Sequence, residues 1–125
     1  MAAQTRQWDF MSDFIDLAGS SGARYRFQRV TNTSILPAIA GNFVYVRGQG
    51  PDLTLICAGT GETLAHAASR WAEAVREHQA EAIFVRRNVS RRSREQEHRD
   101  IVEQHDLPME APEDFGWPGT DGQPS

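Results

Sequence analysis

Arginines gather between residues 86 and 99 of the chain. The arginines of this window that we expect to contact nucleic acid are Arg86, Arg87, Arg91, Arg92 and Arg94. A guanidinium group stays charged at physiological pH and pairs with phosphate through parallel hydrogen bonds. The same window holds two glutamates, so a solvated helix face with local ion pairs is the competing interpretation. The window therefore indicates either a surface that binds a nucleic-acid backbone or a solvated helix face with local ion pairs, and the sequence leaves both open.

Other reactive side chains form weaker patterns. Cys57 is the only cysteine, which excludes an intramolecular disulfide, and it lies in the apolar run 53–58 where a buried thiol is expected. His98 and His105 are two helical turns apart, too far to bind one metal ion from a single straight helix. The sequence therefore predicts neither a reactive thiol nor a zinc site.

The composition is that of one small globular domain. The chain has 125 residues, of which 39% are hydrophobic and 24% charged. A net charge of −4 argues against a protein that covers nucleic acid with its whole surface. All 13 basic residues are arginines, which fits either a GC-rich coding sequence or selection for phosphate recognition. With no apolar run of membrane-spanning length, we expect no membrane partner and a cytoplasmic location.

Hydrophobic periodicity predicts short strands and helices that alternate along the chain. The expected elements are a helix at 9–18, strands at 25–29, 42–47 and 53–58, a helix at 62–78, a strand at 82–86 and a helix that begins near 93. The strands at 42–47 and 53–58 flank a glycine-rich and proline-containing connection, so we expect an antiparallel hairpin. Ser93 and Gln96 have the spacing of a capping box.

These elements divide the chain into three parts. Residues 1–22 are expected to form an N-terminal helix and linker, 23–109 the domain, and 110–125 a flexible tail. The tail carries Glu110, Glu113, Asp114 and Asp121 and no basic residue, so it is opposite in charge to the arginine window.

Four positions within 25–109, about two-thirds of the chain, resemble the motifs of GIY-YIG nucleases. The first family motif falls on Gly41-Asn42-Phe43 and the second on Cys57-Ala58-Gly59. The arginine early in the family's first core helix falls near Ala67, and Arg70 lies one helical turn further along the chain. The metal-binding glutamate falls on His98, with Glu97 adjacent but about 100° away around the helix.

The resemblance implies an α+β, α/β sandwich-like fold with a small three-stranded, mainly antiparallel sheet flanked by helices, to which this chain adds an N-terminal helix and an extra strand. It also implies a catalytic site in which a glutamate holds one Mg²⁺ or Mn²⁺, tyrosines assist a water and an arginine stabilises the phosphate. The corresponding positions here are Phe43, Tyr45, Cys57, Arg70 and His98. Both motif tyrosines are replaced, and an imidazole is a poor ligand for a hard cation, so we expect no cofactor.

Three functional hypotheses follow. The leading one is a catalytically degenerate GIY-YIG-like domain that acts as a binding or interaction module for nucleic acid or a protein partner. The first alternative is a divergent, metal-dependent DNA endonuclease that uses Tyr45, Arg70 and either Glu97 or His98. The second alternative is a small structural or regulatory protein of a phage or mobile element. The sequence leaves the partner and the oligomeric state open.

Overall fold

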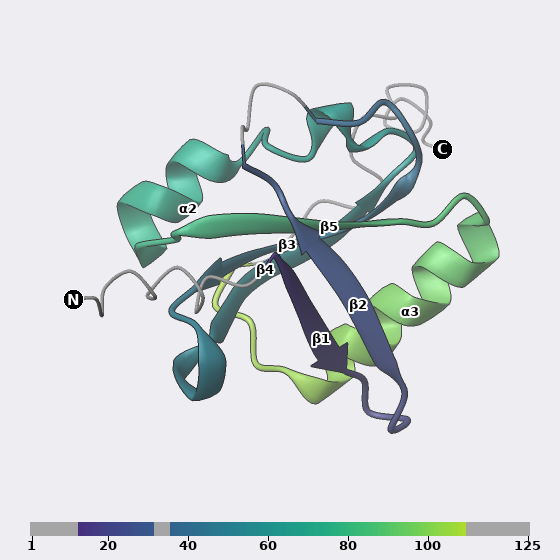
Figure 1. Cartoon of the computed structure of the whole chain (residues 1–125), viewed down its shortest axis with the longest axis horizontal. Coiled ribbons are helices and arrows are strands. Elements are labelled where there is room, and N and C mark those ends of the chain that lie inside the picture. Colours follow the sequence, from purple (N-terminus) through teal and green to yellow (C-terminus); the bar gives the residue numbers. More distant parts are fainter. Residues whose placement is uncertain (1–12, 32–35, 110–125) are drawn as a thin grey trace.

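A curled antiparallel sheet of five strands runs through the domain (Figure 1). The structure is a computed structural model that describes residues 13–31 and 36–109. The strands are β1 (Phe14–Ala18), β2 (Arg24–Arg29), β3 (Gly41–Arg47), β4 (Thr54–Gly61) and β5 (Ala82–Arg87), and their order across the sheet is β1-β2-β5-β3-β4. Every neighbouring pair is antiparallel.

Helices cover both faces of this sheet (Figure 1). The short 3₁₀ turn η3 (Leu64–His66) and helix α2 (Trp71–His78) lie on one face, and helix α3 (Arg91–Gln104) lies on the other. A second 3₁₀ turn, η2 (Gly50–Asp52), connects β3 to β4. No helix in the described part of the chain is long and apolar enough to cross a membrane.

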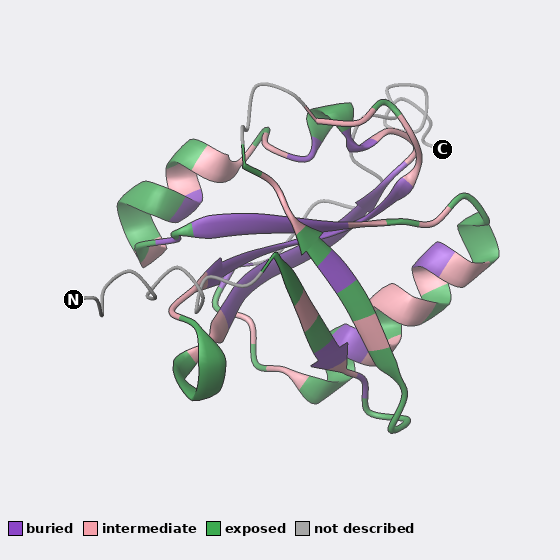
Figure 2. Cartoon of the chain, viewed as in Figure 1, coloured by how far each residue is buried: buried purple, intermediate pink, exposed green. Residues whose placement is uncertain are grey.

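Strand alternation divides the core into two clusters. On β3, Phe43 and Tyr45 face α2, whereas Val44 and Val46 face α3, as expected from the period of two along a strand. β3 is buried over almost its whole length, because both faces are covered and β4 and β5 flank it (Figure 2). β3 therefore holds its side chains in fixed positions on both faces.

Most of the expected strands are confirmed. The predicted hairpin forms between β3 and β4, with a bulge between Tyr45 and Val46, and the strands predicted at 25–29 and 82–86 are β2 and β5. The α+β class is also confirmed. The predicted sheet has three strands and one extra strand, whereas the observed sheet has five. The difference arises because β1 pairs with β2, and β2 pairs with β5.

The predicted helix at 9–18 is wrong where the structure describes it. Phe14–Ala18 is strand β1, and residues 9–12 lie outside the described residues. Leu17 is buried while Phe14 and Asp16 are exposed, an alternation that suits a strand paired with β2. The apolar residues fit helical spacing as well, and a neighbouring strand decided between the two conformations.

The predicted helix at 62–78 is regular only from Trp71 onward. Thr63 caps η3 by accepting a hydrogen bond from the Ala65 N–H, and the Leu64 N–H donates to the Ile39 carbonyl. These bonds hold the segment before α2 in a tighter turn. The N-cap of α3 also differs from the prediction. The N-cap residue is Ser90, not Ser93, and its side chain accepts a hydrogen bond from the Ser93 N–H.

Gly59, the glycine of the second motif, lies against the ring of Phe43. A Cβ added at this position would come within 2.4 Å of that ring. We therefore expect Gly59→Ala to destabilise the protein by about 1–3 kcal/mol, the usual cost of overpacking a core. Urea unfolding measures the loss, and the double variant Gly59→Ala/Phe43→Leu is the control. If steric conflict is the cause, the two substitutions together cost less than their sum; additive losses would contradict it.

Candidate nucleic-acid interface

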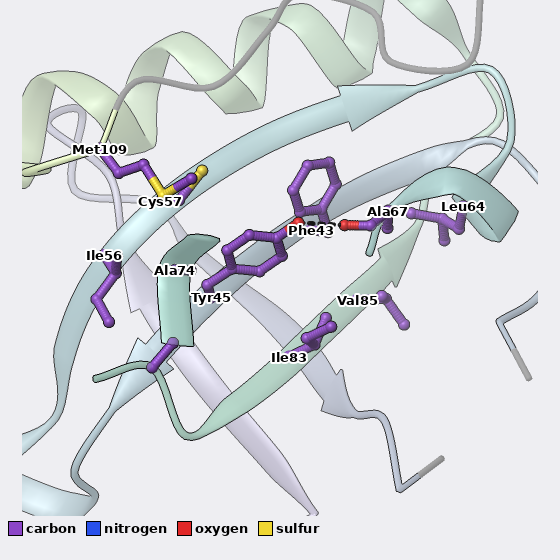
Figure 3. Packing of buried hydrophobic residues seen from close by; sticks show 11 residues of the cluster. Phe43, Tyr45, Ile56, Cys57, Leu64, Ala67, Ala74, Ile83, Val85 and Met109 are labelled. Carbon is purple, nitrogen blue, oxygen red and sulfur yellow. Dashed lines mark hydrogen bonds between the residues drawn. The ribbon is translucent and has the colours of Figure 1, made fainter. Parts of the chain in front are cut away.

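The positions that match the nuclease site on β3 and β4 are buried. Phe43, Tyr45 and Cys57 lie in the cluster beneath η3 and α2, and Figure 3 shows Tyr45 and Phe43 packed together there. None of these residues is more than 1% exposed. Phe43 and Tyr45 lie on the same face of β3. These side chains form part of the hydrophobic core and do not line a cleft.

Both hydrogen-bonding functions of the Tyr45 hydroxyl are used inside the protein. It donates to the Ala67 carbonyl at 2.6 Å (Figure 3) and accepts the Arg70 N–H at 3.3 Å. The ring also packs edge-on against Trp71. Burial raises the pKa of this phenol well above its usual range. In this arrangement Tyr45 fixes the turn that precedes α2 and has no access to a water or phosphate in solvent.

Cys57 is a buried core thiol. Burial raises its pKa to about 11, so the thiolate that would react is scarce near neutral pH. We expect a thiol-specific disulfide reagent to modify folded protein at pH 8 at less than about a tenth of the rate for urea-unfolded protein. Absorbance of the released reagent anion measures both rates, and equal rates would show that the thiol is accessible.

The two remaining positions of the nuclease-like set lie apart from each other. Arg70 precedes α2, and its guanidinium binds both carboxylate oxygens of Glu73, at 2.8 and 2.9 Å. His98 lies half-buried on α3, on the other face of the sheet. The structure therefore brings Phe43, Tyr45, Cys57 and the backbone of Arg70 together and leaves His98 outside the group.

Arg94 was expected on the nucleic-acid surface, and this expectation is wrong. Its side chain is only 1% exposed, and it donates to Glu62 at 2.9 Å and to the carbonyls of Asn88 and Val89. Its position one heptad before the buried Ile101 directs it inward, toward the sheet. Arg94 joins the residue that follows β4, the β5–α3 connection and α3, so it is structural.

Arg86 is also occupied within the fold. Its guanidinium binds Glu97 at 2.8 Å and lies over the ring of Tyr25 at 5.5 Å. Glu97 accepts a further hydrogen bond from Asn88, whose amide also donates to Asn42. The carboxylate of Glu97 is therefore bound by Arg86 and Asn88, whereas the endonuclease hypothesis requires it to bind a metal ion.

Exposed arginines remain on α3 itself. Arg91 and Arg92, both predicted, are exposed in the first turn of α3, and Arg99 lies two turns along the same helix from Arg92. The three residues line an open hollow of about 560 Å³ together with Glu95 and Gln96. Arg91 forms an ion pair with Glu95 at 3.0 Å. We call Arg91, Arg92 and Arg99 the α3 arginine surface.

Arg87 was predicted with this group and is exposed at the end of β5. It follows Arg86 directly on the strand, so its side chain points away from the α3 face. Sequence reasoning included Arg99 in the basic window but not among the contact residues. Its seven-residue separation from Arg92 is the signal that places the two arginines on the same face of α3.

Sequence reasoning also missed an acidic group beside the α3 arginine surface. Asp100 accepts hydrogen bonds from the hydroxyls of Ser21 and Tyr25, at 2.6 and 2.7 Å, and ties the β1–β2 turn to α3. These bonds, led by that from Ser21, lower the pKa of Asp100 to about 2. Because its hydrogen-bonding capacity is directed at the protein, Asp100 stabilises the position of α3.

The described residues, 13–31 and 36–109, contain no group of three or more histidine, cysteine or carboxylate side chains arranged to hold a metal ion.

The chain matches no family model, no curated protein and no solved structure in comparisons with known proteins.

Proposed function

We propose that this protein is a GIY-YIG-like binding module that holds nucleic acid through the α3 arginine surface and does not cleave it. The observation that carries the proposal is a separation within the fold. Apart from the half-buried His98, the side chains that would do chemistry lie in the core or in internal ion pairs, whereas Arg91, Arg92 and Arg99 are exposed together on one helix.

The absence of cleavage is supported by the state of each candidate catalytic group. Tyr45 is 0% exposed, and its hydroxyl is bonded to the backbone at two points. Glu97 is held by Arg86 and Asn88. A nuclease must reach the phosphate and an attacking water with such groups, and both Tyr45 and Glu97 would have to leave their partners first. The endonuclease alternative is therefore the weaker one.

Binding is supported by the geometry of α3. Arg92 and Arg99 are seven residues apart, so they extend from the same side of the helix with a rise of about 10 Å between them. Arg91 and Arg92 also lie at the helix N-terminus, where the backbone carries partial positive charge. These charges lie close enough together to contact several phosphates of one backbone.

The test combines cleavage and binding in one experiment. The full chain is incubated with Mg²⁺ or Mn²⁺ and labelled branched, single-stranded or duplex DNA across a salt series, and products and band shifts are recorded. We expect shifts that weaken with salt and no cleavage. Metal-dependent cleavage that Arg70→Ala abolishes would establish the endonuclease alternative. If neither shifts nor cleavage occur, nucleic-acid binding is wrong and the protein-partner hypothesis remains.

A further inference from the structure

We propose that the acidic C-terminal segment, residues 110–125, binds the α3 arginine surface of its own chain and competes with nucleic acid for it. The competition rests on the proposed function, whereas the contact within the chain does not. The argument uses the charges of the two partners and the length of the segment.

The charges are complementary. The segment carries four carboxylate side chains and no basic residue, namely Glu110, Glu113, Asp114 and Asp121. The α3 arginine surface presents three guanidinium groups, and Glu95, which binds Arg91, is the carboxylate that lines the hollow beside them. Carboxylates pair with guanidinium groups in the same forked geometry as phosphates, so one surface can accept either partner.

The segment starts from a fixed point. Met109, the last described residue, is 3% exposed, and its N–H donates to the Ile56 carbonyl at 3.1 Å. Its side chain packs in the cluster on the α2 face, near Cys57 in Figure 3. The chain has therefore crossed from α3 to the other side of the sheet before residue 110, and the segment would have to return past β4.

The segment is long enough to return. Helix α3 rises about 18 Å from Arg92 to its last residue, Gln104. The five residues from Gln104 to Met109 span at most about 17 Å, so Arg92 lies within about 35 Å of Met109. A random coil of about 16 residues would have a mean end-to-end distance of roughly 22 Å, and a fully extended chain of the same length spans more than about 50 Å. Binding within the chain then occurs at high effective concentration, which compensates for few charges.

The contact is tested without nucleic acid. Thr120→Cys in the full chain adds a second thiol for a nitroxide label, while Cys57 is buried, and the unsubstituted chain controls for labelling of Cys57. We expect the label to broaden amide signals at 91–99 more than those of α2 in low salt, and the difference to vanish near 0.5 M salt. Equal broadening of the two helices, or none, would overturn the contact.

The competition is tested separately by affinity for duplex DNA. The full-length variant with Glu110→Gln, Glu113→Gln, Asp114→Asn and Asp121→Asn should bind about five- to tenfold more tightly than the natural chain at 50 mM salt, and less so at 200 mM. The matched control replaces four carboxylates on other surfaces, with Asp13→Asn, Asp52→Asn, Glu77→Gln and Glu81→Gln. If the control variant gains the same affinity for DNA, the change in net charge explains the effect, and the competition is overturned. If neither chain binds DNA, the proposed function fails, and the label experiment alone decides the contact.

Discussion

Replacing the three arginines of the α3 arginine surface with glutamine should weaken binding to duplex DNA by on the order of 100-fold at low salt. Each arginine that contacts a phosphate displaces bound counterions, so the slope of log affinity against log salt should also fall by about 3. Arg91, Arg92 and Arg99 are exposed side chains on one helix, and glutamine preserves helix propensity, so the fold should be retained. Fluorescence anisotropy across a salt series measures both quantities.

The control for this variant makes the same change in net charge elsewhere. Arg24, Arg26 and Arg76 are exposed on β2 and α2, and their replacement with glutamine should lower affinity several-fold at most. If both variants lose the same affinity, nucleic acid responds to the overall charge of the protein. That result would contradict a defined surface on α3.

Replacing Arg94 with leucine should destabilise the protein by about 2–4 kcal/mol, because it removes a buried cation that donates to one carboxylate and two carbonyls. The substitution leaves Glu62 without its guanidinium and removes the donor to the carbonyls of Asn88 and Val89. Such a loss is a large part of the stability of a small domain. Urea unfolding at neutral pH measures the free energy.

Arg92→Leu is the matched control, because it makes the same chemical change on an exposed residue of the same helix. It should change the unfolding free energy by no more than about 0.5 kcal/mol. A small loss in Arg94→Leu, similar to that of Arg92→Leu, would mean that water replaces the missing hydrogen bonds. Arg94 would then have no structural role of the kind inferred from its burial.

The sequence predicted those parts of the fold that local signals determine. The β3–β4 hairpin follows from two apolar strands around Gly48 and Gly50, both of which have positive φ angles that favour glycine. β1 could not be predicted in the same way, because its apolar residues fit a helix as well as a strand. Pairing with β2, which depends on the folded chain, decides the outcome.

The candidate site was harder to predict than the fold. Arg92 and Arg94 belong to the same basic window and look equivalent in the sequence. In the structure Arg94 is only 1% exposed, whereas Arg92 is exposed. Counting seven residues from Arg94 to the apolar Ile101 would have placed Arg94 on the buried face of α3. The ion pair with Glu62 has no such signal, because it joins residues far apart in the chain.

The resemblance to nucleases placed the chemistry at Phe43, Tyr45 and Cys57, and the structure gives these positions a packing role. Gly59 leaves space for the Phe43 ring, and Tyr45 fixes the turn before α2. Packing alone therefore accounts for the residues at these positions. What the motif could not indicate is the exposed surface on α3, which lies on the other face of the sheet.

The most direct test of nucleic-acid binding at α3 is an NMR titration of the full, ¹⁵N-labelled chain with duplex DNA. We predict that the largest shifts fall on the amides of residues 91–99 and on the Nε–H groups of Arg91, Arg92 and Arg99, and that added salt reverses them. Shifts centred on η3 and α2, or no shifts at all at low salt, would contradict the proposed function.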